Sequence, residues 1–383
     1  MNFEGRVLID LPRRPGSPVA VELARPGDIN RVLCGQTPPS ALQLLPAVYA
    51  VCAIAQSHAA VCALEQAMGV SVSPATANAR KALTAMETLR EHLLRIALDW
   101  PGFIGTAPRG ADIRPVMTTV ARLSKALFGN QPAFAPGNEA HPDRDAAMAI
   151  VDEAEALLEA EVFAEPLQWW RARTTGADIE EWLATANTVA SGVLHRVTSD
   201  GWSTVGATPA VCLQRLSSVA VRRWLQTGRL EDLIRTGSAQ RPVPETTVYS
   251  RHIEDPMLAA FSGNGLAPRL FARLVELARL PSELRMLIGE QKHDAEPMLD
   301  ADGFGWSAID AARGLLVHAA QMQDGVIANY RILPPTRWNF DCEGVAKRCL
   351  STLSNCDEGE KLRQAHLIVN AIDPCVAHNI RMH

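Results

Sequence analysis

The chain has 383 residues, of which 47% are apolar and 21% are charged, and its net charge is −5. This is an ordinary globular composition with ample material for a large core. The acidic balance, without a Lys/Arg-rich cluster that holds interleaved aromatics, argues against a general nucleic-acid binder. Eight cysteines are too sparse for a disulfide scaffold, and the N-terminus lacks the regions of a secretion signal, so a reduced, cytoplasmic protein is expected.

The predicted elements run from two strands, through a long helical body, to a hairpin. Residues 7–11 and 19–23 are predicted strands on either side of a turn rich in proline and glycine. Residues 315–318 and 326–332 are predicted strands joined through Asp324-Gly325, a strong hairpin signal. Helices are predicted at 41–68, 75–98, 111–127, 144–160, 178–195, 208–226, 266–289, 343–353 and 358–370.

The expected fold class is therefore mainly α with a small β component. A single domain is expected, with an N-terminal β-hairpin at about 1–25, a helical body at about 40–300, and a hairpin and C-terminal segment at about 305–383. Residues 41–64 carry no charge, but their alanines and polar side chains favour a buried core helix over a membrane span.

The cysteines are candidate ligands because a thiolate is a soft donor suited to iron, nickel, copper or zinc. No Cys-x-x-Cys pair occurs. Cys342, Cys349 and Cys356 recur every seven residues, but Asp-Glu-Gly after the third interrupts a common helix, so small buried hydrophobes are favoured over a metal site. Cys62 and Cys212 lie in Ala-, Val- and Leu-rich segments predicted to be helical, and they are interpreted in the same way.

The tail Asp373-Pro374-Cys375-Val376-Ala377-His378 differs from these cysteine segments. Proline fixes φ and holds the following thiol in a defined turn. The Cys-x-x-His spacing of Cys375 and His378 suits two ligands on one turn, so the tail is a candidate metal-binding turn. A zinc site completed by His383 is one alternative.

This tail resembles the end of nickel–iron hydrogenase large subunits, Asp-Pro-Cys-x-x-Cys, with the first cysteine kept as Cys375 and the second replaced by His378. The family's other two nickel ligands come from an N-terminal Cys-Gly-x-Cys that precedes a patterned helix. The helix pattern favours Cys52 as the second of these cysteines, with Tyr49 at the first. Cys34, in Cys34-Gly35, is the competing match. The residues that fit the helix pattern after Cys52 are Ala59, Val61, Ala63, Glu65, Ala67 and Gly69.

Other segments resemble the family in the same order along the chain. The segment 310–314, followed by His318, is similar to the Pro-Arg-Gly segment that lays an arginine, here Arg313, over the metals. At the N-terminus, Glu4-Gly5 resembles a segment that brings a proton-handling glutamate near the metals.

The segment 334–339 resembles the family's Pro-Thr-Thr-Trp-Asn loop, with Pro335 and Thr336 at matching positions. The resemblance implies that Arg313, Pro335 and Thr336 line a pocket around the iron's cyanide ligands. Guanidinium, hydroxyl and backbone N–H groups all donate hydrogen bonds to anionic diatomic ligands, so the implied pocket is chemically sound.

In this comparison two of the four nickel thiolates are missing, at Tyr49 and His378, which argues against stable nickel and against hydrogen turnover. The chain is thus not expected to be an enzyme. It looks like the large-subunit-like accessory proteins HupK and HoxV, which are regarded as scaffolds of hydrogenase maturation. The resemblance implies that Cys52 and Cys375, with His378 as a substitute ligand, hold iron carrying two cyanides and one carbon monoxide.

The implied partners are the true large subunit, which would receive the iron, and small chaperones of the HypC and HypD type, without nucleic acid or membrane. The pair Trp169-Trp170 is either a partner surface or part of the core. Two further alternatives stay open, a redox enzyme with an altered metal site and a metal-free interaction module.

Overall fold

The computed structural model describes residues 5–14, 17–24, 29–234, 242–289, 302–353 and 357–383. Its strands are β1 Arg6–Leu11, β2 Ala20–Ala24, β3 Phe304–Ala311, β4 Gly314–Gln323, β5 Val326–Leu333 and β6 Ala377–Met382. Its α-helices up to the middle of the chain are α1 Ile29–Leu33, α2 Pro38–Val48, α3 Ala53–Met68, α4 Pro74–Leu94, α5 Thr119–Phe128, α6 Arg144–Leu158, α7 Leu167–Arg171, α8 Gly176–Thr185 and α9 Val189–Ser199. The later ones are α10 Ser218–Thr227, α11 Glu231–Ile234, α12 Val248–His252, α13 Pro256–Ala259, α14 Leu266–Gly289, α15 Pro335–Asn339, α16 Val345–Ser351 and α17 Glu358–Ile372.

One small sheet joins the two ends of the chain. Its strand order is β2-β1-β6, with β1 antiparallel to β2 and parallel to β6. The two predicted N-terminal strands are confirmed. The strand β6 was not predicted, because its first residues belong to the candidate metal-binding turn 373–378. The parallel pairing runs from Arg6 opposite Ala377 to Leu11 opposite Met382, so the residues after Cys375 are held against the start of the chain.

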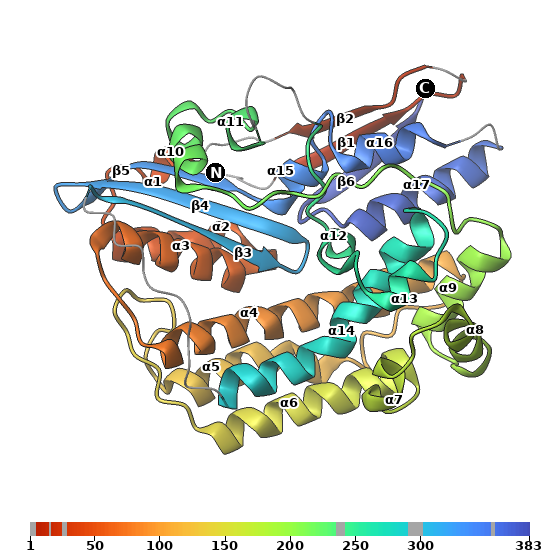
Figure 1. Ribbon diagram of the computed structural model, residues 1–383, viewed down its shortest axis with the longest axis horizontal. Coiled ribbons are helices and arrows are strands. Elements are labelled where there is room, and N and C mark those ends of the chain that lie inside the picture. Colours follow the sequence, from red (N-terminus) through yellow and green to blue (C-terminus); the bar gives the residue numbers. More distant parts are fainter. Residues whose placement is uncertain (1–4, 15–16, 25–28, 235–241, 290–301, 354–356) are drawn as a thin grey trace.

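The second sheet has the order β3-β4-β5 and is antiparallel throughout. The predicted hairpin is confirmed: Asp324 and Gly325 both have positive φ, 51° and 78°, as a two-residue type I′ turn requires. Helix α3 packs across β3 and β4, as Figure 1 shows. The close approach depends on Gly305, where an added Cβ would lie 2.0 Å from the Ala63 carbonyl oxygen.

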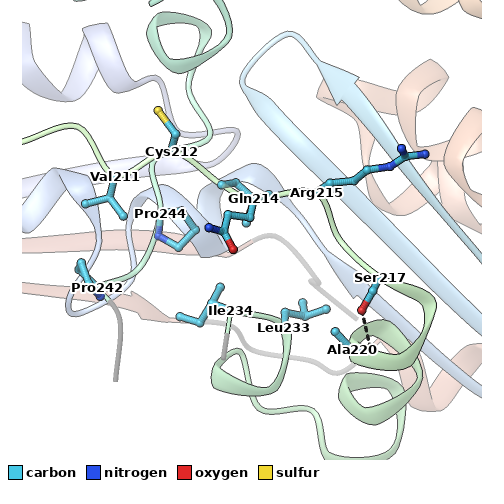
Figure 2. Close-up of a pocket in the computed structure, with 11 residues that line it drawn as sticks. Val211, Cys212, Gln214, Arg215, Ser217, Ala220, Leu233, Ile234, Pro242 and Pro244 are labelled. Atoms are coloured by element: carbon cyan, nitrogen blue, oxygen red, sulfur yellow. Dashed lines mark hydrogen bonds between the residues drawn. The ribbon is translucent and has the colours of Figure 1, made fainter. Parts of the chain in front are cut away.

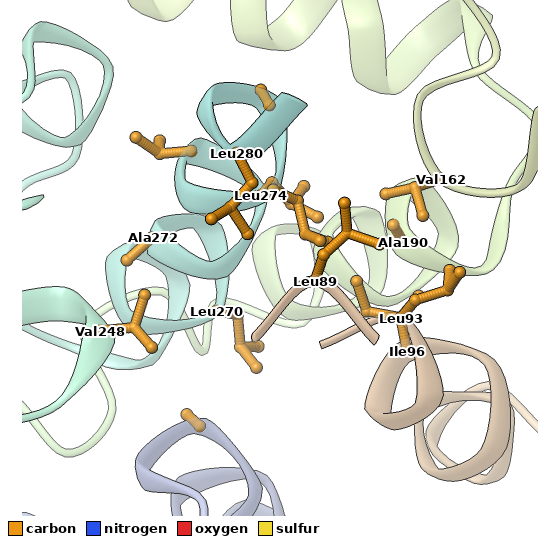
Figure 3. Close-up of a cluster of buried hydrophobic side chains, with 14 of the residues drawn as sticks. Leu89, Leu93, Ile96, Val162, Ala190, Val248, Leu270, Ala272, Leu274 and Leu280 are labelled. Carbon is orange, nitrogen blue, oxygen red and sulfur yellow. The ribbon is translucent and has the colours of Figure 1, made fainter. Parts of the chain in front are cut away.

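The helical body lies on the other side of α3 from this sheet. Helices α4, α14 and α6 run alongside one another in Figure 1, and α9 and α12 also contact α14. Their shared core is apolar. Figure 3 shows how side chains from α4, such as Leu89 and Leu93, meet Leu270 and Leu274 of α14. This core fixes α4, which carries several residues of the candidate site.

Four predicted helices differ from the structure. The helix at 41–68 is broken at Tyr49–Cys52 into α2 and α3. In the helix predicted at 111–127, α5 begins only at Thr119, after the 3₁₀ turn Arg114–Thr118. The helix at 178–195 is interrupted at Ala186–Thr188, and the segment 208–217 is extended, so the helix predicted at 208–226 begins only at Ser218. No single helix of the described residues is long and apolar enough to cross a membrane. The α2 and Ala50–Met68 pair reaches that length only together, and it is bent by 106°.

Candidate functional site

Cys52 lies at the bend between α2 and α3, where it ends the 3₁₀ turn Ala50–Cys52 and immediately precedes α3. Its side chain is buried, with 7% of the residue exposed. The first free N–H groups of α3, on Ile54 and Ala55, donate to the two carboxylate oxygens of Glu87 at 2.9 Å each. Because Glu87 is a residue of α4, the capping contact anchors the start of α3, and with it Cys52, to the helical body.

Cys375 lies just beyond the end of α17, in the turn that leads to β6. Its backbone N–H donates to Thr336 Oγ1 at 3.0 Å, and its Sγ lies 2.8 Å from the same oxygen. Thr336 is buried in the first turn of α15, which Pro335 opens with a fixed φ suited to that position. The loop therefore holds Cys375 through one hydroxyl group.

Arg313 is buried between these segments, at the turn from β3 to β4. It donates to Asp373 and Glu91 at 3.2 Å each. Burial disfavours the guanidinium charge, but Asp373, Glu91 and the Cys375 and Cys52 thiols outweigh it, so the pKa of Arg313 is raised. Arg313 is thus within electrostatic range of both thiols.

The two thiols also act on each other. Burial raises the pKa of the Cys52 thiol well above its usual range, and the charge of Cys375 is the next cause, followed by that of Glu87. Arg313 and the Gln56 amide oppose this rise. The structure therefore brings Cys52, Cys375, Arg313 and Thr336 into one site, although they come from opposite ends of the sequence.

Asp373 orders the charges around this site. It ends α17 in the left-handed conformation, with φ of 62°, and it is buried. Its carboxylate accepts from Arg95 at 2.5 Å and from Arg273 and Arg313 at 3.2 Å each. Burial raises the pKa of Asp373, but the three guanidinium groups, Arg313 foremost, hold it well below its ordinary value.

The remaining predicted site residues lie elsewhere. His378 is an exposed residue of β6, so it does not share one turn with Cys375 as predicted, and its ring lies 6.1 Å from that of His366. The His383 ring bonds Asp10 of β1 at 2.9 Å rather than facing Cys375 and His378 as a third ligand. Cys34 is exposed in a glycine turn before α2, and its thiol donates to Asn30 O. Glu4 lies outside the described residues.

The other cysteines differ in burial. Cys349 is buried, as predicted, but Cys342 is exposed, so its predicted burial is wrong. Cys356 lies outside the described residues. Cys212 is exposed on the extended segment 208–217, so its predicted burial in a helix is wrong. It borders a separate cavity of about 270 Å³ that shares no lining residue with the thiol site, and its sulfur points away from Leu233 and Ile234 (Figure 2).

Glu87, Glu91, Arg95 and Gln56 belong to this site but were not predicted from the sequence. Glu87 and Glu91 lie one turn apart on α4, but their neighbours on that face include Thr84, Thr88 and Arg90, so the pattern is that of an ordinary polar helix face. Arg95 and Gln56 carried no signal either. Among the described residues, no three His, Cys, Asp or Glu side chains are grouped so that they could hold a metal ion.

No protein-family model matches the chain. The chain is 28% identical to the hydrogenase expression/formation protein HoxV of Cupriavidus necator, over 96% of this chain and 94% of that one. It is 27% identical to the hydrogenase expression/formation protein HupK of Azotobacter vinelandii, over 99% and 98%. Its fold is similar to that of the Ni-Fe-Se hydrogenase of D. vulgaris Hildenborough, with a TM-score of 0.62 over 94% of each chain at 15% identity. The predicted fold class and resemblance are therefore confirmed: over nearly its whole length this chain is similar to the accessory proteins HoxV and HupK, on a hydrogenase large-subunit-like fold.

Proposed function

We propose that this protein is a maturation scaffold that holds iron carrying two cyanides and one carbon monoxide, and passes it to a hydrogenase large subunit. The observation that carries the proposal is that the Cys52 and Cys375 thiols lie within electrostatic range of each other and of buried Arg313, with Cys375 in contact with Thr336. The names of the relatives, which are expression/formation proteins rather than hydrogenases, support a role in maturation.

The site's chemistry suits this cargo. The diatomic groups would fill three positions on the iron, so the protein needs to supply fewer ligands than for a bare ion. Cys52 and Cys375 offer two thiols for this purpose. Arg313 and Thr336 are buried N–H and O–H donors beside these thiols, as anionic cyanides require. In a buried site such donors are worth more than in water.

Infrared spectroscopy tests the proposal directly. The protein would be purified without oxygen from a strain that contains the maturation machinery, and CN and CO stretching bands are expected. Cys52→Ala, Cys375→Ala protein should lose the bands, whereas Cys34→Ala, which alters an exposed thiol, should keep them. Bands that persist in the double variant, or are missing from the unaltered protein under loading conditions, would refute the proposal.

One observation favours a metal-free interaction module as the second candidate. The donors of the site already have protein partners, because Arg313 bonds Asp373 and Glu91 while Thr336 bonds Cys375. Metal analysis of the anaerobically purified protein separates the candidates. Stoichiometric iron supports the scaffold, nickel or measurable hydrogen uptake indicates an altered redox enzyme, zinc indicates a different metal site, and no metal supports the module.

A further inference from the structure

A chain of buried polar groups leads away from Cys52 into the second sheet. The Tyr330 hydroxyl lies 2.7 Å from His318 Nδ1, and His318 Nε2 lies 2.9 Å from Gln56 Oε1. The Gln56 amide nitrogen then donates to Cys52 Sγ at 3.9 Å, near the long limit for a sulfur acceptor. The chain joins β5, β4 and α3, and each of its members is buried.

Each link in this chain constrains the next. A neutral imidazole has one N–H, so one ring nitrogen donates and the other accepts. His318 is neutral, because burial lowers its pKa to about 3. If Tyr330 donates to Nδ1, the proton of His318 is on Nε2 and is given to Gln56 Oε1. The amide must then present its N–H group toward Cys52 rather than its oxygen.

The opposite direction gives the opposite result at Cys52. If His318 carried its proton on Nδ1, it would donate to the Tyr330 oxygen, and Nε2 would accept from the Gln56 amide. The Gln56 oxygen would then face Cys52 and would repel a thiolate or a metal-bound sulfur. The hydrogen bond between Tyr330 and His318, remote from the site, thus decides whether the N–H group or the oxygen of the Gln56 amide faces the Cys52 sulfur.

We propose that Tyr330 and His318 are positioning residues that fix the Gln56 amide with its N–H toward Cys52, so that the sulfur meets a donor when it becomes a ligand. Hydrogen bonds to a ligating sulfur withdraw electron density and tune the metal. The link to iron rests on the proposed function. The direction of the hydrogen bonds from Tyr330 to Cys52 does not rest on the proposed function, because it is a property of the iron-free protein.

The tautomer of His318 tests the orientation without iron. Nitrogen NMR of protein labelled in its 10 histidines would be recorded, with the His318 signals identified by their loss in His318→Gln. The proton is expected on Nε2. Tyr330→Phe should release this preference, whereas Tyr249→Phe, which removes a hydroxyl bonded to Asn264, should leave the His318 signals unchanged. A proton on Nδ1 in the unaltered protein would overturn the inference even if both variants fail to fold.

The infrared bands test the consequence for iron. In loaded protein, Gln56→Leu removes the donor, so the CO and CN bands should move to lower frequency while remaining present. Bands at unchanged frequency would overturn the role of Gln56 toward the ligand. If the unaltered protein shows no bands at all, the proposed function fails, and the tautomer measurement still decides whether the chain is oriented as inferred.

Discussion

Asp373 pairs with three arginines around the site, Arg95, Arg273 and Arg313. Asp373→Asn keeps the shape of the side chain but leaves Arg95, Arg273 and Arg313 without their shared carboxylate. Breaking a buried ion pair from one side costs about 3–5 kcal/mol, so a loss of this size in the free energy of unfolding is expected. Urea denaturation measures it.

The control for that substitution is a surface aspartate with the same partner type. Asp112→Asn breaks the exposed pair with Arg109 and should cost less than about 1 kcal/mol. The pKa of Asp373 is depressed, so its contribution is complete above the unfolded-state pKa of an aspartate and is lost only as pH falls below it. Equal effects of the two substitutions at pH 7 would contradict this account.

His58 also makes the stability of the protein depend on pH, but for a different reason. It is a base that burial keeps neutral, whereas Asp373 is an acid that its arginine partners keep charged. His58 is buried on α3 against Thr84, and burial lowers its pKa to about 3. Between pH 6.5 and about 3, only the unfolded chain takes up the proton, so stability falls as pH falls through this window. His58→Gln should remove up to about 1.4 kcal/mol of that loss per pH unit.

The measurement is the free energy of unfolding of both proteins between pH 7 and pH 4. The same change at exposed His141 controls for the loss of an imidazole without burial. A difference between His58→Gln and the unaltered protein that stays constant with pH would show that His58 is not held neutral.

Part of the site could be predicted from the sequence, but only through the resemblance. The resemblance led to Cys52, Cys375, Arg313 and Thr336, which the structure places in one region. It could not indicate that Asp373 binds three arginines, because two of them come from helical segments whose arginines looked like any solvated side chain. The turn geometry predicted for His378 was wrong because pairing with β1 holds the residues from Ala377 onward extended.

Among the elements, α3 packs closely against strand β3. Gly305→Ala would place a methyl group 2.0 Å from the Ala63 carbonyl oxygen and 2.5 Å from the Ala67 nitrogen. Because backbone atoms cannot move aside as a flexible side chain can, α3 and β3 must separate, at a cost of about 1–3 kcal/mol or more. Thermal and urea unfolding of the variant measure the cost.

Gly102→Ala is the matched control, since an added Cβ there meets nothing within 4 Å and φ is not positive. It should change stability by less than about 0.5 kcal/mol. If the Gly305 variant were as stable as this control, the close contact between α3 and β3 would be disproved. A displaced α3 should also disturb Cys52, which immediately precedes this helix. The difference in reactivity between the buried Cys52 thiol and the exposed thiols should then become smaller.

Elements were predicted well where local signals and tertiary contacts agree. The hairpin at Asp324-Gly325 and the helix at 266–289 are examples. The break before α3 has no local signal of its own, because its first N–H groups are satisfied by Glu87 from another helix. The extended segment 208–217 is likewise set by distant contacts: Val211 O accepts from Glu245 N at 2.8 Å, and Thr208 O accepts from Asn264 at 3.2 Å.

At the scale of the whole molecule, the β2-β1-β6 sheet ties the two ends of the chain together. Deleting residues 377–383 would expose one edge of β1 and remove its parallel ladder. At about 0.5–1.5 kcal/mol for each hydrogen bond, a loss on the order of 3 kcal/mol is expected, with association through the open edge. Urea unfolding and light scattering measure the two effects.

His383→Ala is the control for this deletion, because it removes only the exposed contact with Asp10. It should cost less than about 1 kcal/mol. An unfolding midpoint of the shortened protein equal to that of His383→Ala would show that β6 contributes nothing to the fold.

The whole-molecule architecture was predictable mainly through resemblance. Periodicity alone indicated many helices and two hairpins, but it could not place the long-range pairing of β1 with β6, since parallel partners so far apart share no turn. The Trp169-Trp170 pair illustrates the same limit, because Trp169 is 61% exposed as a residue and Trp170 only 2%. Neighbouring residues of one type have opposite environments that only the packing of α7 decides.

The pairing of β1 with β6 also sets an order of events during synthesis. Cys52 leaves the ribosome early, whereas Cys375 and strand β6 follow only after the whole helical body has been made. The two thiols cannot come together before that segment is synthesised, because contacts of such sequence separation form only after the intervening chain is available. A nascent chain that lacks Cys375 therefore cannot form the thiol site.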